Sequence, residues 1–552
     1  MKRSIWLYFV AACFYFLILL VGTIFLRMNF SDSNFSGGDL VYMFPKLTWF
    51  YLVLLPIGVL LIKKLDKRLS IIIPFTFTIL LLILFELVQY PSIFFWDTFS
   101  HSATTRHIIN NGSFSSTAGY YEYPGTFFIS AALSEVLGLS VLFSNLFFAA
   151  ILNLLIIILL FAIGKVFVKT EKARIEMSWL VPTIYLVFSF RLFNSNHFSP
   201  QLFGLCLYIF LVYSILKTFF VRKRVWSVLV LVLITALTVT HVFSSLFAIT
   251  TLLCICLFGR LTRPLKLDIR EFVTLGMLMI AVVLFVSWHE FVSTEPWTEA
   301  LRFLSLVLRG EKTLSGFAQT IVLRPMTEPL LPLLGLYRYG IYGLFAFLSA
   351  SALLLFRRKI EVKLLFFMGI GILLGGVVIY LTPATFGVGR ALLYAGVVIS
   401  TLSSYIIANK RAKSLTFRRV IEILKTVLPF LVIGTFLVSN LYYSTYVSFI
   451  HQDEMQMVQF VATNVKRQIS LLVDDALLIP FYANVSIPVL VIDEYDNTTI
   501  AQMKNEKSYL SLQYLPRQLY YFNSSFTSNR NSLIYSNGLG IIYAKTNLDG
   551  RK

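Results

Sequence analysis

Long apolar stretches, separated by short polar segments, repeat along most of the chain. A helix needs about 20 consecutive apolar residues to cross the hydrocarbon core of a bilayer. Windows of roughly that length predict about 13 membrane-spanning helices. These windows lie near residues 5–26, 46–62, 70–90, 141–164, 178–190, 200–220, 226–240, 243–258, 271–288, 336–356, 362–381, 387–407 and 421–442. The pattern therefore predicts an α-helical polytopic membrane protein.

Two further apolar stretches need their own interpretation. Residues 126–139 are too short to cross a bilayer, so we expect an interfacial helix or a shallow re-entrant one. The run that ends at Leu26 follows Lys2 and Arg3, as the apolar part of a signal peptide would. Because it is long and no small-residue cleavage site follows it, we expect a retained first span.

The periodicity changes near residue 443. Apolar residues at helical spacing predict an amphipathic helix over 451–468. Residues 476–483 and 487–495 are predicted to be strands. Asn537-Gly538 separates two β-prone runs, which is typical of a β-hairpin. This part of the chain therefore predicts a small α/β fold.

Two domains follow from this change of pattern. Residues 1–442 are predicted to form a multi-span transmembrane domain, and residues 443–552 a C-terminal extracytoplasmic α/β domain. The second domain has few candidate site residues. We interpret its acidic residues Asp493, Glu494 and Asp496 as part of a solvated loop.

Composition supports a membrane protein. Of 552 residues, 57% are hydrophobic and only 13% are charged, about half the charged share of a soluble domain. All four cysteines lie in apolar runs, and their spacing predicts neither a disulfide framework nor a zinc site.

The net charge of +20 comes mainly from the short loops between the predicted spans. Cytoplasmic loops of membrane proteins collect Lys and Arg. With the spans above, every strongly basic loop falls on one side of the membrane. These loops are 2–3, 63–68, 165–174, 222–224, 259–266, 357–363 and 410–419. We therefore expect a cytoplasmic N-terminus in the cell membrane, and interpret the charge as topology rather than nucleic-acid binding.

The opposite, outer side receives the longer loops, above all 91–140 and 289–335. Long ordered loops in compact proteins are usually functional, so we expect the functional face there. Five Asn-x-Ser/Thr sequons on this side are compatible with glycosylation. They begin at Asn34, Asn111, Asn484, Asn497 and Asn523.

The first outer loop contains the strongest candidates for chemistry. Asp97 follows three aromatic residues, and on a helix Asp97 and His101 would be one turn apart on the same face. Glu122 precedes a Pro-Gly turn that leads back to the membrane. A partly desolvated carboxylate can serve as a general base. Asp97 could also cap its helix, and both roles can coexist. Arg106 and His107 are interpreted as surface residues of that helix.

Later outer turns contribute three polar candidates. His197 and Gln201 flank Pro200, although Pro at the start of a helix explains this stretch equally well. His241 lies between two apolar runs, and it is either a site residue or a structural histidine inside the protein.

Arg338 and Arg390 lie at the outer ends of predicted spans. Arg binds phosphate through its planar fork, although both side chains could instead extend to the lipid interface. Further cations are scattered in the second long outer loop. The chain has no Walker loop, no dinucleotide fingerprint and no zinc-binding His-x-x-x-His helix. We therefore expect a substrate that arrives already activated.

Several of these features together resemble the C-type (GT-C fold) polytopic membrane glycosyltransferases of archaea and bacteria. They are an acid in an early outer loop, a Tyr-Pro-Gly turn, "FSPQ", a later outer histidine and a small α/β tail ending in "IYSNGLGIIYA". In plan the chain is similar to protein mannosyltransferases and oligosaccharyltransferase catalytic subunits. The resemblance implies a polyprenyl (dolichyl) phosphate-linked sugar donor, used on the outer face, with Asp97 as the catalytic acid residue.

The chain departs from this family in two ways. Asp97 lacks the adjacent second acid that members often have, and the tail has no Trp, so the Trp-Trp-Asp-Tyr-Gly motif is absent. This favours transfer of a single sugar over transfer of a whole glycan to Asn.

Because a phosphate is a good leaving group, one base and phosphate-binding cations suffice for an inverting transfer to an acceptor hydroxyl. Asp97 is the expected base. His101 would orient it or bind the acceptor, and Glu122, His197, Gln201, His241, Arg338 and Arg390 are candidates for donor or acceptor binding.

The expected partners are the lipid-linked donor, a glycan, lipid or protein acceptor, and membrane lipids. No cofactor is expected, although a divalent metal held by Asp97 and Glu122 remains an alternative. The competing functions are a transporter or flippase of lipid-linked saccharides and an oligosaccharide polymerase or ligase. No clear internal repeat supports a transporter, and the polar residues gather at span ends rather than mid-membrane.

Overall fold

The structure is a computed structural model of the whole chain. It describes residues 96–113, 123–168, 171–193, 198–221, 223–261, 275–293, 331–380 and 387–408, isolated positions between 305 and 431, and five strands after residue 468. The predicted spans near 5–26, 46–62 and 70–90 lie outside the described residues. So does most of the span near 421–442.

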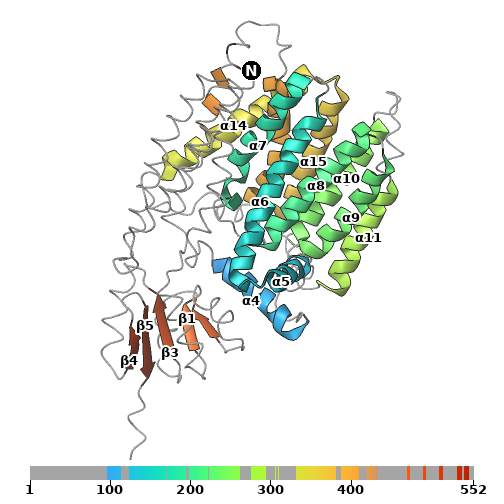
Figure 1. Cartoon of the computed structure of the whole chain (residues 1–552). Helices are drawn as coiled ribbons and strands as arrows, with labels where there is room; N and C mark the ends of the chain where they lie inside the picture. The colour runs from blue at the N-terminus through green and yellow to red at the C-terminus, as the bar shows by residue number, and fades with distance from the viewer. Residues whose placement is uncertain are drawn as a thin grey trace, which may run out of the picture.

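Long helices form most of the described chain (Figure 1). They are α4 (Trp96–Asn111), α5 (Gly125–Leu137), α6 (Val141–Val166), α7 (Glu171–Phe193), α8 (Pro200–Val221), α9 (Arg224–Thr240), α10 (Val242–Leu261), α11 (Leu275–Phe291), α14 (Leu331–Leu355), α15 (Ile360–Tyr380) and α16 (Gly387–Ala408). Each predicted span between 141 and 407 is thus a helix, with ends that differ by a few residues.

Four stretches of the described chain are long and apolar enough to cross a membrane. They lie in α6, α8, α15 and α16. The described parts of α9, α10, α11 and α14 contribute apolar helices of 10–17 residues. An apolar helical membrane protein is therefore supported, whereas the total of about 13 spans stays a prediction.

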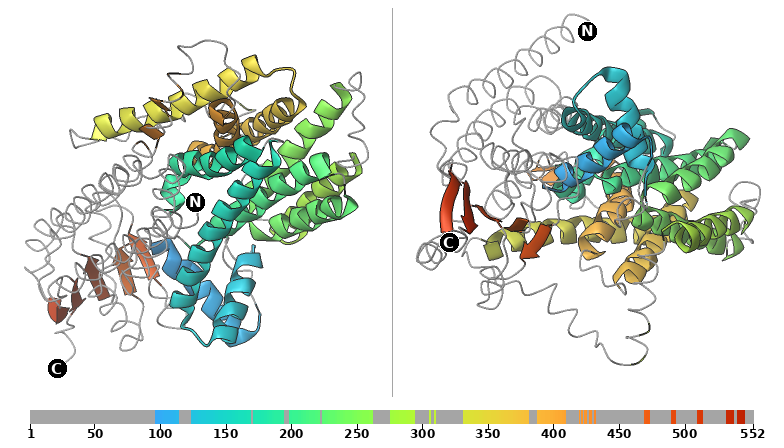
Figure 2. Two further views of the ribbon diagram at one scale, coloured as in Figure 1. Left: turned by 45° about the horizontal axis from the view of Figure 1, so that its top comes forward. Right: turned by 90° about the horizontal axis from the view of Figure 1, so that it is seen from below.

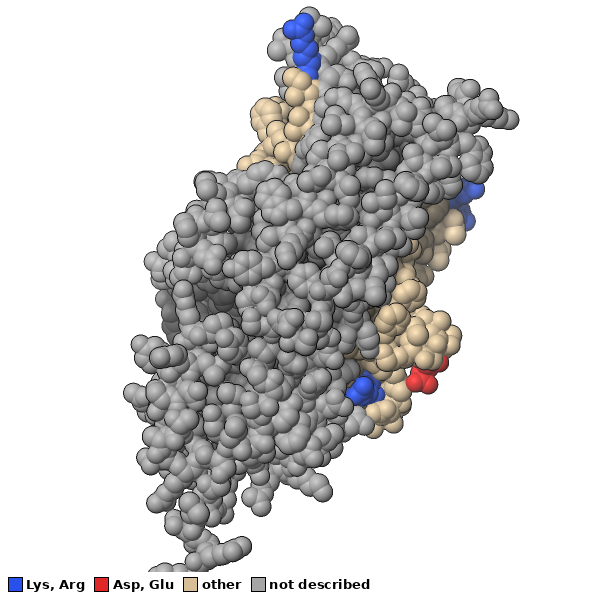
Figure 3. All heavy atoms as spheres, turned by 60° about the vertical axis from the view of Figure 1, so that its left-hand side comes forward, with Lys and Arg blue, Asp and Glu red and all other residues tan. Residues whose placement is uncertain are grey.

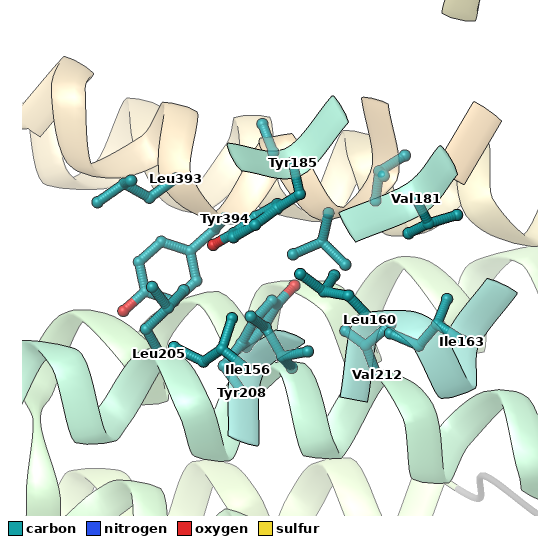
Figure 4. Close-up of a cluster of buried hydrophobic side chains, with 14 of the residues drawn as sticks. Ile156, Leu160, Ile163, Val181, Tyr185, Leu205, Tyr208, Val212, Leu393 and Tyr394 are labelled. Carbon is teal, nitrogen blue, oxygen red and sulfur yellow. The ribbon is translucent and has the colours of Figure 1, made fainter. Parts of the chain in front are cut away.

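The core lies where α6, α7, α8 and α16 meet (Figure 4). Ile156 and Leu160 of α6 pack in the same buried cluster as Tyr185 of α7, Tyr208 of α8 and Tyr394 of α16. Tyr208 and Tyr394 meet edge to face with ring centroids 5.0 Å apart, a favourable aromatic geometry. The core is therefore aromatic toward the amino-terminal ends of α8 and α16.

Glycines allow the closest helix contacts. A Cβ built on Gly371 of α15 would lie 2.6 Å from the backbone oxygen of Thr250 in α10. One built on Gly164 of α6 would lie 2.6 Å from the backbone oxygen of Met177 in α7. Close approach of helix backbones at small residues is the usual packing mode in membranes.

One end of the bundle brings together the first residues of some described helices and the last residues of others. Ser244 near the start of α10 bonds Tyr394 near the start of α16. Tyr123, before α5, bonds His289 near the end of α11. Figures 1 and 2 show the blue helices α4 and α5 lying across this end. It is the end that the sequence predicts to be outer.

The opposite end gathers the other helix ends. Phe167 after α6 meets Phe220 of α8 and Tyr405 of α16, with ring centroids 6.3 and 5.5 Å apart. The basic residues of the described helix ends are concentrated here; they include Lys165, Lys217, Lys223, Arg224, Arg357, Arg358, Lys359 and Lys363. The described helices therefore alternate in direction as the basic loops predicted.

Helix α5 agrees with the short helix expected at 126–139. It buries small and polar residues, including Ser130 and Ser134, and leaves Phe128, Ile129 and Val136 exposed. An apolar outward face suits a helix at the edge of a bilayer. On the face drawn in Figure 3, the described surface is largely uncharged, with isolated basic and acidic side chains.

The tail contains a five-stranded sheet with the strand order β2-β1-β3-β5-β4. Its strands are β1 (Ile469–Leu472), β2 (Val489–Ile492), β3 (Tyr509–Gln513), β4 (Asn531–Ser536) and β5 (Gly540–Lys545). Strands β4 and β5 pair antiparallel around Asn537-Gly538, so the hairpin is confirmed. The strand expected over 487–495 is β2.

Sequence patterns did not predict β1 and β3, which pair in parallel at the middle of the sheet. The helix expected over 451–468 and the strand over 476–483 lie outside the described residues, and the domain boundary at 442/443 stays a prediction.

Candidate active site

Asp97 lies in the first turn of α4, which begins at Trp96. The predicted helix is therefore present, and Asp97 and His101 are four residues apart on one face of it. His101 and Thr105, the next two positions on that face, are buried. Negative charge in the first turn is also stabilised by the helix dipole, so the position suits a carboxylate for structural reasons too.

His101 is buried among aromatic rings. Only 4% of its surface is exposed, and its ring centroid lies 5.6 Å from that of Phe127 in α5 and 6.3 Å from that of Phe198, just before α8. Burial lowers the pKa of His101 to about 3, because the charged imidazolium would lose its hydration. His101 is therefore neutral at physiological pH and cannot act as a cation toward phosphate.

Hydroxyl and amide groups join α4 to α5 and α6. Asn145 of α6 donates from Nδ2 to Ser102 Oγ of α4 over 2.7 Å, and Asn145 Oδ1 accepts from Ser130 Oγ of α5. All three side chains are buried. Buried hydrogen bonds of this kind fix the relative position of the elements that they join. The helix that carries Asp97 is thus held firmly against the bundle.

The Tyr-Pro-Gly turn is held at both of its ends. Tyr123 Oη bonds His289 Nε2 over 2.8 Å. Two residues later, a Cβ built on Gly125 would lie 2.8 Å from Thr240 Oγ1 and 3.1 Å from the Val239 backbone oxygen at the end of α9. A larger residue would require Thr240 to shift, so this close approach favours glycine after Pro124.

His241 lies between α9 and α10 and caps α10. The backbone N–H of Ser244 donates to its Nδ1 over 3.3 Å, and Ser244 Oγ lies 2.9 Å from the same atom. Ser244 Oγ is also 2.5 Å from Tyr394 Oη of α16. His241 therefore has a structural contact at Nδ1, and through Ser244 it links α10 to α16, while its role as a site residue stays a prediction.

Arg390 lies in the first turn of α16, four residues before Tyr394 and on the same helix face. Gln201 lies in the first turn of α8 and is half-buried, three residues before Gly204. A Cβ built on Gly204 would lie 2.9 Å from His241 Cβ. The structure thus brings the elements that carry Gln201, His241 and Arg390 together at the predicted outer end.

For the remaining predicted site residues, the structure gives less information. Arg338 lies within α14, eight positions into a helix that begins at Leu331. Glu122 and His197 lie outside the described residues, as do the side chains of Asp97, Arg338 and Arg390. In the described part of the chain, no three His, Cys, Asp or Glu side chains gather in a way that could hold a metal. Since neither Asp97 nor Glu122 contributes a described side chain, the metal alternative stays open.

His289 was not among the predicted site residues, although it is buried at the same end of the bundle. Its partner Tyr123 is 166 residues earlier in the chain, and no local pattern connects the two. The one sequence signal that could have identified His289 is its position, because histidine is rare in this chain and this one lies at the predicted outer end of an apolar span.

Comparison with known proteins was informative at the level of structure. No family model matches the chain, and no curated protein matches its sequence. The oligosaccharyltransferase of Archaeoglobus fulgidus superposes with a TM-score of 0.53 at 11% identity, over 87% of this chain and 75% of that one. ArnT of Cupriavidus metallidurans, bound to undecaprenyl phosphate, superposes with a TM-score of 0.50 at 12% identity, over 82% and 94% of the two chains. The chain has the GT-C fold.

The expected resemblance is thus confirmed at the level of fold, together with its membrane character. The similarity extends over most of this chain and most of both solved structures. Because the identity is only 11–12%, this similarity shows the fold alone. The candidate site residues are argued from the sequence and from the positions of their helices.

Proposed function

We propose that this GT-C protein is a membrane glycosyltransferase that moves a single sugar from a polyprenyl phosphate to an acceptor hydroxyl on the outer face. The proposal is carried by one observation: in a GT-C fold, Asp97 lies in the first turn of α4, a helix held across the bundle end where the elements bearing Gln201, His241 and Arg390 meet.

Proteins of similar structure support the choice of donor. A structure of the Archaeoglobus fulgidus protein contains an inhibitory peptide and a dolichol-phosphate, and the ArnT structure contains undecaprenyl phosphate. A lipid-linked donor also agrees with the absence of nucleotide-binding motifs from this sequence. The acceptor is a hydroxyl of a glycan, a lipid or a protein.

The reaction is a single displacement. The acceptor hydroxyl gives its proton to the Asp97 carboxylate while its oxygen forms a bond to the anomeric carbon. The bond between that carbon and the phosphate oxygen breaks on the opposite side, so the configuration inverts. The polyprenyl phosphate leaves with the electron pair, and its negative charge is stabilised by Arg390 and Arg338.

His101 plays a supporting part in this scheme. Being neutral and buried, it shapes the face of α4 one turn beyond Asp97 and packs that face against Phe127 and Phe198. It neither carries charge to the phosphate nor competes with Asp97 for the acceptor proton. The N-terminus and basic loops would face the cytoplasm, and the tail would lie outside.

The test is sugar transfer by the full-length protein in membranes, supplied with radiolabelled polyprenyl-phosphate hexoses and pentoses and a cell-envelope extract as acceptor. Asp97→Asn keeps the size of the side chain but removes the base, so transfer should fall by about 10²-fold or more. Glu135→Gln, which changes an exposed carboxylate of α5, is the matched control.

Wild-type transfer by Asp97→Asn at matched expression would overturn the assignment of the base. Movement of intact donor across the membrane without cleavage of the sugar–phosphate bond would favour the flippase instead.

A further inference from the structure

Three buried side chains connect the first outer loop to the second. Tyr123 precedes α5, His289 lies in the last turn of α11, and Ser293 follows that helix. Ser293 Oγ donates to Tyr123 Oη over 2.9 Å, and Tyr123 Oη lies 2.8 Å from His289 Nε2. The exposed fractions are 4% for Tyr123, 1% for His289 and 0% for Ser293, so water contributes little to these contacts.

The chain of hydrogen bonds has a defined direction. His289 Nδ1 lies 2.8 Å from the backbone oxygen of Phe285, and because a carbonyl can only accept, Nδ1 carries the proton. A neutral imidazole then accepts at Nε2, so Tyr123 donates to His289. Ser293 donates in turn to Tyr123. Each bond in the series Ser293, Tyr123, His289, Phe285 is therefore compatible with the next.

The series joins segments that are far apart in sequence. Tyr123 and His289 are 166 residues apart, and the second long outer loop begins at the end of α11. Glu122 is joined to Tyr123 by one peptide bond, and Gly125 packs against Thr240, the residue before His241. The segment from Tyr123 to Gly125 is thus attached to α11 on one side and to the α9–α10 junction on the other.

A purely apolar contact would not hold the turn in the same way. Phe in place of Tyr and Leu in place of His would bury similar area but would allow the two loops to slide. A directed series of buried hydrogen bonds has one arrangement in which every member is satisfied. This is a geometry suited to positioning.

We propose that Tyr123, His289 and Ser293 form a latch that holds the first outer loop against the start of the second and so positions the first loop for sugar transfer. The positioning role rests on the proposed function. None of the three residues needs to touch the donor, because the latch acts by limiting where the segment from Tyr123 to α5 can move.

The latch itself is tested by amide hydrogen exchange on the full-length protein in lipid nanodiscs. Tyr123→Phe keeps the ring and removes the hydroxyl, so exchange over residues 123–128 and 289–293 should speed up about tenfold. His289→Leu should act similarly, whereas His289→Gln offers a carbonyl to Tyr123 and should restore much of the protection. Tyr405→Phe, a buried tyrosine at the opposite end, is the matched control.

The positioning role is tested by transfer kinetics of the same variants with the polyprenyl-phosphate donors above. Tyr123→Phe should lower kcat by about 10- to 100-fold with little change in KM, because a small misplacement of the reacting groups costs rate more than binding. His289→Gln should be more active than His289→Leu.

Unchanged exchange in Tyr123→Phe would overturn the latch. Faster exchange with wild-type kcat would overturn its positioning role. If the wild-type protein transfers no sugar, the proposed function and the positioning role with it are wrong, while the exchange data still decide whether the latch joins the two loops.

Discussion

At the residue scale, the buried imidazoles in this structure have different functions that burial alone does not reveal. His101 packs among phenylalanine rings, His241 caps α10, and His289 accepts from a tyrosine. A histidine in a membrane protein's outer loop invites a catalytic interpretation. Here each ring has contacts that also help to hold the fold, while catalytic or binding roles for His101 and His241 stay predictions and Asp97 stays the candidate base.

Burial of His101 predicts a pH-dependent stability. The folded chain holds His101 with a pKa of about 3, whereas the unfolded chain would protonate it near 6.5. Between these values the unfolded state binds more protons, so stability is lost as pH falls below about 6.5, by about 1.4 kcal/mol per pH unit. His101→Asn should flatten this dependence between pH 6.5 and 4.5, as measured by thermal unfolding in detergent. An equal slope in both proteins would contradict the prediction.

The sequence predicted some site residues better than others, for a physical reason. Asp97 and His101 are related by helical spacing, which is a local property, and the helix that relates them is present. The pairs Tyr123–His289 and Ser244–Tyr394 are related only by the packing of helices 166 and 150 residues apart. No spacing rule connects residues that tertiary structure alone brings together.

At the element scale, the long helices were predicted reliably because apolar length is itself the constraint that a bilayer imposes. In the sheet, the sequence predicted β2 from a β-prone run and the hairpin of β4 and β5 from the turn signal Asn537-Gly538. Strands β1 and β3 are four and five residues long and pair in parallel. Short parallel strands have no turn between them and no alternation long enough to recognise.

Close packing at glycine between α10 and α15 predicts that two Gly→Ala substitutions will change stability by different amounts. In Gly371→Ala the new Cβ would meet the Thr250 backbone, which cannot move without shifting the helix, so we expect a loss of stability of about 2 kcal/mol. Gly340 of α14 has no atom within 4 Å of its Cβ position, so Gly340→Ala should be neutral or stabilising by up to about 1 kcal/mol. Thermal unfolding of both variants in detergent tests the difference. Equal midpoints would show that α10 and α15 are less closely packed than described.

At the scale of the whole molecule, charge and packing agree about which helix ends lie together. Basic residues were used to sort the loops into two sets. Among the described residues, the helix ends beside the basic loops 165–174, 222–224 and 357–363 lie at one end of the bundle. Charge can be used to sort loops because the cytoplasmic loops of membrane proteins collect Lys and Arg whatever the fold. No comparable signal in the sequence predicted which helices pack closely together, such as α10 with α15.

The positive-inside rule predicts that the basic end of the bundle faces the cytoplasm. Single cysteines placed in a variant lacking the native four should therefore react in a defined pattern with a membrane-impermeant maleimide on intact cells. Asn110→Cys, exposed on α4, and Lys552→Cys, at the end of the tail, should be labelled. Lys359→Cys, exposed between α14 and α15, should be labelled only after the membrane is permeabilised. Labelling of Lys359→Cys but not Asn110→Cys on intact cells would invert the topology and place Asp97 in the cytoplasm, where a donor used on the outer face could not reach it.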